Sequence, residues 1–228
     1  MITPSARLVA YLEPHHLQDA ADVVRIYFTP RPTGRFTGAH FERFEGGGDR
    51  PSVADEFTAE DLVAVSMLSV QVVGTAALEV LLHRRNRLRE LLRQVPTDLT
   101  LADVEPASIT PEWPAWRVYT ELRSIGQIGP TTASKLLARK RPHLVPVYDT
   151  VIAAELGVVD GRLWQPLNEW LTADGRSNEA HVQRIRAAAG LGTDISLLRV
   201  FDVLVWMVGK GYAPDLTSSA ANPESDRG

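Results

Sequence analysis

Three observations predict an all-α fold for this chain. Apolar residues recur with helical spacing in most segments, and glycine or proline stands where these segments end. The alternation of apolar and polar residues that is typical of β-strands is weak and confined to one stretch. The chain has 228 residues, of which 44% are hydrophobic, and a net charge of −4. We expect two helical parts packed as one unit, residues 1–110 and 111–212, followed by a disordered polar tail, residues 213–228.

Residues 13–28 form the first predicted helix, because Leu17 and Phe28 belong to one helical stripe. From residue 29 to 55 the chain is rich in Gly, Pro, Arg and Phe and contains a run of three glycines. This composition predicts a long irregular segment. A short two-stranded element is the alternative, since residues 35–44 alternate weakly between apolar and polar side chains.

Thr58 has the character of a helix N-cap, with Asp61 among the acidic residues of the first turn. This N-terminal signal predicts a helix over residues 58–73. A leucine-rich stripe predicts a second helix over residues 76–94. Residues 95–113 are a proline-rich connection.

In the C-terminal part, Asp149 directly precedes an apolar stretch and is placed to cap a helix that Gly157 ends. The last helix before the tail is apolar over most of its circumference, which predicts a place in the core. The helices expected here cover residues 150–156, 164–171, 178–189 and 195–208.

Between Leu122 and Asp149 the pattern predicts two helices joined by a tight turn. Gly126 and Gly129 supply residues free to take positive φ, and Pro130 suits the first position of the second helix. A turn of this kind directs unpaired backbone N–H groups from residue 128 to residue 132 outward at a helix N-terminus. We expect such a central helix-hairpin-helix to bind an anion, with nucleic-acid phosphate as the leading candidate.

Two segments of the chain are basic. Residues 130–145 contain four Lys or Arg and no acid, and residues 83–94 contain five Arg against one Glu. Each segment carries +4, which leaves −12 for the rest of the chain. Positive patches on an acidic body are one interpretation, and two solvated helix faces are the other. On the first interpretation, the residues expected to contact DNA are Gly126, Gln127, Ile128, Gly129, Thr131, Thr132, Lys135, Arg139 and Lys140.

The hairpin at residues 125–133, followed by Val-Pro-Val-Tyr-Asp at residues 145–149, resembles the core of the helix-hairpin-helix DNA glycosylase superfamily. The resemblance covers about thirty residues and is compatible with a bacterial branch of that superfamily. It implies DNA binding and a catalytic role for Asp149. The position of the lysine in the strand-cleaving members aligns with Thr120, so the resemblance implies a monofunctional enzyme without lyase activity.

The chemistry of such an enzyme requires few groups. Cleavage of an N-glycosidic bond builds positive charge on the sugar, which a carboxylate such as Asp149 stabilises while it orients water. Tyr148, Trp113, Trp116 and Tyr119 are candidates to line the pocket for an extruded base, and core positions are the alternative for each. For Asp149 the alternative is a role as helix cap alone.

Other classes of site have little support in the sequence. The chain has no cysteine, and its six histidines are scattered, so we expect no metal site and no cofactor. No signal peptide or membrane-length apolar run is present, which predicts a cytoplasmic protein without a membrane partner. Three functions stay open: a DNA glycosylase-like enzyme, a catalytically silent DNA-binding module, and a helical scaffold that binds a protein partner.

Overall fold

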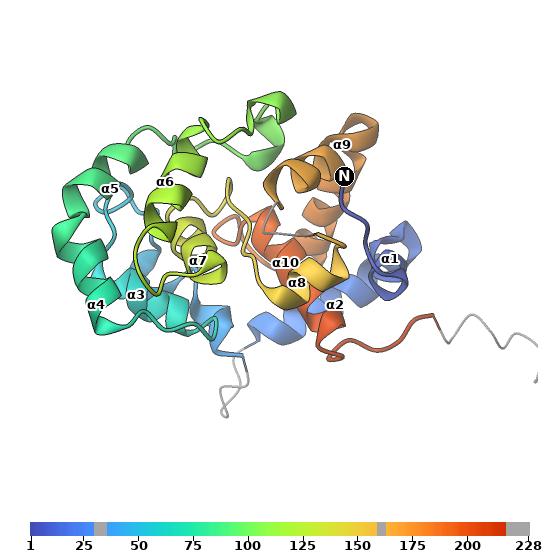
Figure 1. The fold of residues 1–228 in the computed structure, drawn as a ribbon. Coiled ribbons are helices and arrows are strands. Elements are labelled where there is room, and N and C mark those ends of the chain that lie inside the picture. Colours follow the sequence, from blue (N-terminus) through green and yellow to red (C-terminus); the bar gives the residue numbers. More distant parts are fainter. Residues whose placement is uncertain (30–35, 159–162, 218–228) are drawn as a thin grey trace, which may run out of the picture.

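A computed structural model describes residues 1–29, 36–158 and 163–217. The described residues contain ten α-helices, several short 3₁₀ helices and no β-strand, so the predicted all-α fold is confirmed (Figure 1). None of these helices combines the length and the apolar character that crossing a membrane requires. The helices are α1 (Ala6–Leu12), α2 (Leu17–Phe28), α3 (Ala59–Ser66), α4 (Gly74–Leu78), α5 (Arg85–Leu92), α6 (Pro114–Arg123), α7 (Pro130–Lys140), α8 (Thr150–Glu155), α9 (Trp164–Ala188) and α10 (Leu197–Gly209).

Helix α10 runs through the middle of the molecule and packs against α2, α8 and α9 (Figure 1). Ten of its residues are buried, which confirms the core position predicted from its apolar circumference. Gly209 lies where α8 passes closest, because a Cβ there would meet Val151 Cγ1 at 2.6 Å. This glycine therefore serves helix packing.

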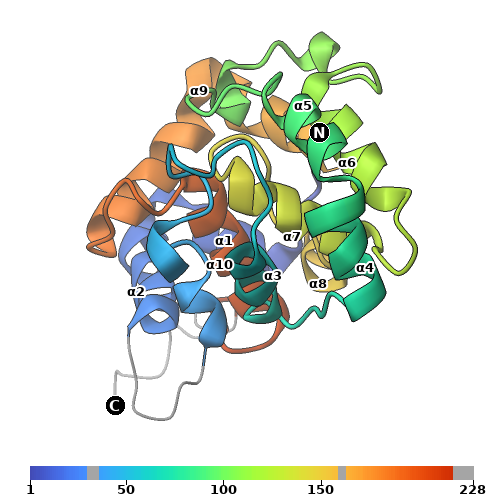
Figure 2. The ribbon, with the colours of Figure 1, turned by 90° about the vertical axis from the view of Figure 1, so that its left-hand side faces the viewer.

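Helix α7 is the second central element. It lies between α3 and α6, and α6 in turn packs against α5 (Figures 1 and 2). Nine of the eleven residues of α7 are buried. A helix covered on so many sides has little surface left for solvent or for a large ligand.

Local signals locate several helix ends correctly. Thr58 and Asp61 form a reciprocal capping box at the start of α3, and Asp149 caps α8. Gly157 follows α8 with a φ of 62°. The helix predicted over residues 58–73 is shorter than expected, because Ser69 takes a φ of 62° and breaks it.

The helix predicted over residues 76–94 is divided into α4, a π turn at Glu79–His83, and α5. Helix α9 contains non-helical dihedral angles at residues 173–176, so it consists of two helical segments, as predicted.

The predicted disordered tail is wrong at its start: Ala213 is buried, and Tyr11 donates a hydrogen bond of 2.6 Å to the Pro214 carbonyl. Residues 218–228 lie outside the described part.

The segment between α2 and α3 is irregular, and the two-stranded alternative is not found in its described part, residues 36–58. Short 3₁₀ helices occupy Thr37–His40 and Phe44–Gly46 instead. Without a strand partner, the carbonyl oxygens of this segment need other donors. Side chains of α7 supply them, as described below.

Candidate active site

A cavity of about 380 Å³ opens beside α7, α8 and α10. Its walls come from segments far apart in the sequence: the end of α2, the loop after α3, the first turns of α7, the start of α8 and one face of α10. The charged residues that line it are Lys135, Asp149, Arg199, Asp202 and Lys210.

Asp149 uses its two carboxylate oxygens for different purposes. Oδ1 accepts hydrogen bonds from the backbone N–H groups of Val151 and Ile152, both at 3.0 Å, and so caps α8. Oδ2 takes no part in the cap and lies 4.0 Å from Lys135 Nζ. The predicted cap is confirmed, and it leaves one oxygen of Asp149 for other chemistry.

Lys135 faces the cavity, whereas the basic pattern had predicted a solvated residue that contacts DNA phosphate. Only 4% of the residue is exposed, and Nζ donates a hydrogen bond of 2.8 Å to the Leu68 carbonyl. Burial lowers the pKa of Lys135, and the nearby Asp149 carboxylate opposes that shift. The lysine beside Asp149 thus comes from α7. Thr120, which aligns with the lysine of the strand-cleaving enzymes, is exposed on α6.

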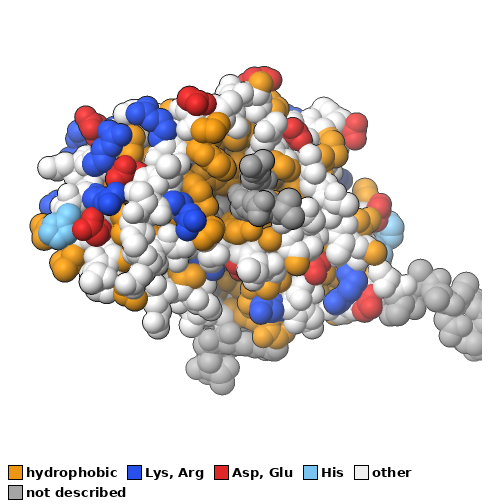
Figure 3. Space-filling model, in the orientation of Figure 1, with side chains coloured by type: hydrophobic (Ala, Val, Ile, Leu, Met, Phe, Trp, Pro, Cys, Tyr) orange, Lys and Arg blue, Asp and Glu red, His pale blue; other side chains and the backbone are white. Residues whose placement is uncertain are grey.

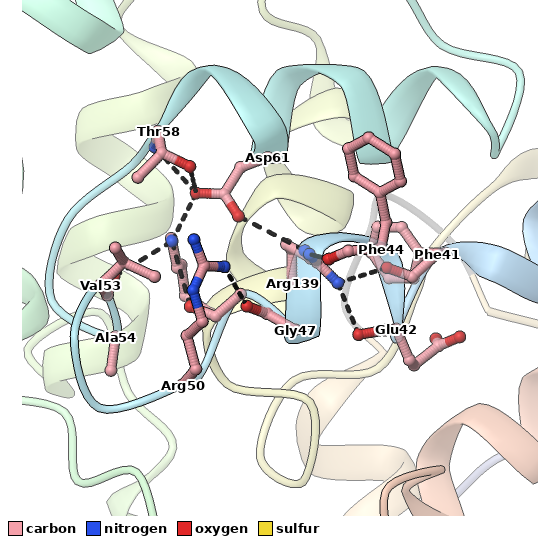
Figure 4. A network of polar contacts seen from close by, with 12 residues as sticks. Phe41, Glu42, Phe44, Gly47, Arg50, Val53, Ala54, Thr58, Asp61 and Arg139 are labelled. Atoms are coloured by element: carbon pink, nitrogen blue, oxygen red, sulfur yellow. Dashed lines mark hydrogen bonds and ion pairs between the residues drawn. The ribbon is translucent and has the colours of Figure 1, made fainter.

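Arg139 and Lys140 are also buried, so their predicted contacts with DNA are wrong for this structure. Their exposed fractions are 2% and 0%, and both form ion pairs with Asp61 (Figure 4). Arg139 donates to the carbonyls of residues 41, 42 and 44, and Lys140 donates to those of residues 48 and 53. The irregular segment before α3 therefore covers these cations, because its unpaired carbonyls require donors.

The turn between α6 and α7 differs from the predicted one. The positive φ belongs to Gln127, at 69°, and neither glycine of the turn adopts one. Ile128 donates its N–H to the Ile125 carbonyl at 3.1 Å, so the run of free donors begins after it. A Cβ added to Gly126 or Gly129 would meet no atom within 4 Å, and therefore the fold itself does not require glycine at either position.

The nine residues predicted to contact DNA are thus divided by burial. Gly126 and Gln127 are exposed, and Gly129 and Thr131 are half-buried. The buried ones are Ile128, Thr132, Lys135, Arg139 and Lys140. An exposed cation that the prediction omitted, Arg123, donates to the Ile128 carbonyl at 3.1 Å.

The second basic segment is exposed but balanced by acids. Arg84 pairs with Glu79 and Glu121, and Arg85 pairs with Glu56. Figure 3 shows blue and red side chains side by side over this part of the molecule, near α5. The interpretation as a solvated helix face fits this segment.

The floor of the cavity is a buried ionic cluster on α10. Arg199 Nη1 donates to Asp202 Oδ1 at 2.6 Å, and Arg199 Nε lies 2.7 Å from Glu42 Oε1. Arg199 Nη2 donates to the Tyr27 hydroxyl at 2.8 Å. The sequence contained a signal for this cluster, namely an Arg and an Asp three residues apart in an otherwise apolar helix.

The aromatic wall of the cavity consists of Tyr27, Phe36 and Trp206. Tyr27 and Phe36 stack with ring centroids 5.2 Å apart and an interplanar angle of 22°. The predicted liners are elsewhere: Trp113, Trp116 and Tyr119 pack around Trp164 in a separate cluster, and Tyr148 does not line the cavity. For the two tryptophans and Tyr119 the alternative of a packing role is the one observed.

A family model matches residues 20–209 of the chain. The chain belongs to DUF6308, a family of unknown function. No curated protein and no solved structure matches it. The range matched by the DUF6308 model contains every cavity-lining residue except Lys210, so the cavity lies within the family's domain. In the described part of this DUF6308 protein, no three His, Asp or Glu side chains are grouped as a metal site would require.

Proposed function

We propose that this DUF6308 protein binds DNA and hydrolyses the N-glycosidic bond of a nucleotide received in the cavity. One observation carries the proposal: Asp149 Oδ2 is left free by the helix cap and belongs to a cavity that continues to the first turn of α7. Thr131 lines that cavity, and the exposed turn lies immediately before it in the chain. A phosphate site at the turn and a carboxylate in the cavity are therefore neighbours.

The turn supplies the phosphate contact in this proposal. Gly126 and Gly129 have open space where a side chain would stand and ordinary φ values, which suits close approach of an external group to the backbone. The first N–H groups of α7 have no acceptor within the helix and lie at the positive end of its dipole. Arg123 at the turn and Lys210 at the cavity add exposed cations.

The cavity supplies the base pocket. Its volume of about 380 Å³ is within the range of small-molecule sites. The rings of Tyr27, Phe36 and Trp206 offer an apolar wall for a planar base. Extruding a nucleotide from a duplex costs a few kcal/mol, which such a wall offsets.

Asp149 is the reacting carboxylate in this mechanism. As the bond between C1′ and the base nitrogen lengthens, positive charge develops on the sugar, and the Oδ2 oxygen stabilises it. The same oxygen accepts a proton from the attacking water. Lys135, 4.0 Å away, holds that oxygen in position.

A helical scaffold without catalytic activity is the second candidate. Burial of Lys135, Arg139 and Lys140 favours it, because these cations are withdrawn from the surface of a protein whose net charge is already −4. On this alternative Asp149 is a cap, and the cavity has no reaction to perform.

A panel of duplexes, each with one damaged base, separates the two candidates. We expect the wild-type protein to bind them at low salt and to release at least one base, and Asp149→Asn to release none. Asp98→Asn is the matched control, since Asp98 is exposed and does not line the cavity. Absence of release by the wild type overturns the proposal. Binding without release then leaves a catalytically silent DNA-binding module, and absence of both leaves the scaffold.

A further inference from the structure

Asp202 is a second carboxylate of the cavity, and its surroundings differ from those of Asp149. It lies on α10 and is 3% exposed, and its Oδ1 accepts a hydrogen bond from Arg199. Oδ2 is buried and has no hydrogen-bond partner among the described residues. Asp202 lines the same cavity as Asp149, and its Oδ2 is a buried carboxylate oxygen without a hydrogen-bond partner in the described part of the chain.

The charges around Asp202 do not balance. Arg199 is shared between Asp202 and Glu42, and both carboxyl groups are about 95% buried. The other groups near this cluster are Tyr27, Lys135, Asp149, Arg139 and Arg43. Each of these three cations has a carboxylate of its own: Lys135 lies beside Asp149, Arg139 pairs with Asp61, and Arg43 pairs with Asp194. One buried guanidinium between two buried carboxylates leaves an excess negative charge, which a bound proton removes.

The proton belongs on Asp202 in preference to Glu42. Burial raises the pKa of both carboxyl groups. Arg199 opposes the rise at both groups. Arg139 and Arg43 oppose it further at Glu42, whereas Glu42 and Asp149 add to it at Asp202, whose pKa reaches about 7. A carboxyl group with this pKa is suited to donate a proton at neutral pH.

We infer that Asp202 is the proton donor to the departing base. The inference rests on the proposed function and assigns the two carboxyl groups of the cavity different roles. Asp149, partly exposed and hydrogen-bonded, acts at the sugar, and Asp202, the more deeply buried lining residue, acts at the base. The class of substrate follows: a neutral base that leaves only slowly without protonation.

Atoms and charges balance in the step. The bond from C1′ to the base nitrogen breaks, and its electron pair goes to the base, which takes the proton from Asp202 Oδ2 at a ring nitrogen or exocyclic oxygen. The water oxygen bonds to C1′ and gives a proton to Asp149. Transfer of that proton from Asp149 through solvent returns Asp202 to its starting state.

Two duplexes that differ only in the leaving base test this role. Hypoxanthine is neutral and needs a proton to leave, whereas N7-methylguanine is already cationic. We expect Asp202→Asn to release hypoxanthine about 10²- to 10⁴-fold more slowly than the wild type and N7-methylguanine within about tenfold of it, because general acid catalysis contributes that much. Asn retains the oxygen that Arg199 requires, so the variant keeps the ion cluster's geometry.

The wild type gives an independent readout that needs no variant. Its release of hypoxanthine, measured in single turnovers from about pH 5 to about 9, should fall above pH 7, while release of N7-methylguanine should not. Equal losses for the two bases in Asp202→Asn, or the same pH profile for both in the wild type, overturn the role of Asp202 alone. Release of neither base by the wild type, together with no release from the wider panel, overturns the proposed function and Asp202 with it.

Discussion

Lys135 Nζ lies 4.0 Å from Asp149 Oδ2, the carboxylate oxygen that the helix cap leaves free. The two residues belong to different elements, α7 and the residue before α8, and meet at the wall of the cavity. Because Oδ1 is committed to two backbone N–H groups, the capping role and the proposed chemical role of Asp149 use different atoms. Substitutions can therefore separate them.

Asp149→Asn should fold with nearly wild-type stability, since an Asn oxygen caps a helix about as well as Asp, whereas Asp149→Ala should lose about 1 kcal/mol. Both variants should lose base release, because neither supplies a negative charge to the sugar. Thermal unfolding and a release assay measure the two effects. Ser5→Ala is the control, because it removes the oxygen that accepts the Leu8 N–H at the start of α1. This variant should lose about as much stability as Asp149→Ala and should keep its activity. A fully active Asp149→Asn would reduce Asp149 to a cap.

Gly126→Ala and Gly129→Ala test the turn as a DNA contact. Each added methyl group meets open space, and neither glycine has positive φ, so both variants should be as stable as the wild type or gain up to about 1 kcal/mol. Their affinity for a duplex should fall about tenfold or more, since the methyl group keeps phosphate from the backbone. Gly74→Ala, at the start of α4 with equally open space, is the control. Fluorescence anisotropy at low salt measures affinity, and unchanged binding by all three variants would remove the turn from the proposal.

Arg123 and Lys210 should each contribute one phosphate contact. Replacing either with Ala should lower the slope of log affinity against log salt by about 0.9, because each lost contact leaves one set of counterions in place. Arg93→Ala, an exposed cation at the end of α5, should leave the slope unchanged. If all three variants keep the wild-type slope, Arg123 and Lys210 are not part of a DNA surface.

Lys140→Met should destabilise the protein by about 3–5 kcal/mol, because it leaves Asp61 buried with one of its two cations gone. Lys140→Glu should prevent folding, since it places two carboxylates together in the interior. Lys210→Met, at an exposed position, should stay within about 0.5 kcal/mol of the wild type. Urea denaturation checks the set, and a stable, well-folded Lys140→Glu would contradict the observed burial.

Asp202 should give the protein a pH-dependent stability of unusual sign. Its pKa is raised from 3.8 to about 7, so between these values the folded state binds more protons than the unfolded state, and stability is lost as pH rises through the interval. The loss amounts to at most about 4 kcal/mol, at 1.36 kcal/mol for each pKa unit. Relative to the wild type, Asp202→Asn should therefore become more stable from about pH 4 to about 7. Parallel stability curves for the two proteins would show that Asp202 is ionised in this range.

The sequence was sufficient for features that depend on neighbouring residues. Thr58, Asp149 and Gly157 mark helix ends through contacts within one turn, and the apolar circumference of α10 required a buried position. The basic run of α7 was misinterpreted, because a charge run without acids looks solvated unless its partners are known. Those partners are Asp61 and the carbonyls of a distant irregular segment, which no local pattern identifies.

The cavity could not be predicted for the same reason. Its aromatic wall joins Tyr27, Phe36 and Trp206 from three segments, and only tertiary packing brings them together. Asp149 was a candidate catalytic residue because of its place after the hairpin, and in the structure it lines the cavity. Asp202 was missed, although a charged pair in an apolar helix was visible in the sequence.

The buried cations of α7 also determine how the molecule can come apart. Arg139 and Lys140 lose water only when the carbonyls of residues 41–53 reach them, and each of the two donates to at least two of these carbonyls. Helix α7 and this irregular segment should therefore open together as one cooperative unit in hydrogen exchange. A stretch of chain without regular secondary structure is thus as firmly retained as the helix beneath it, and a protease should cut it only when the centre of the molecule unfolds.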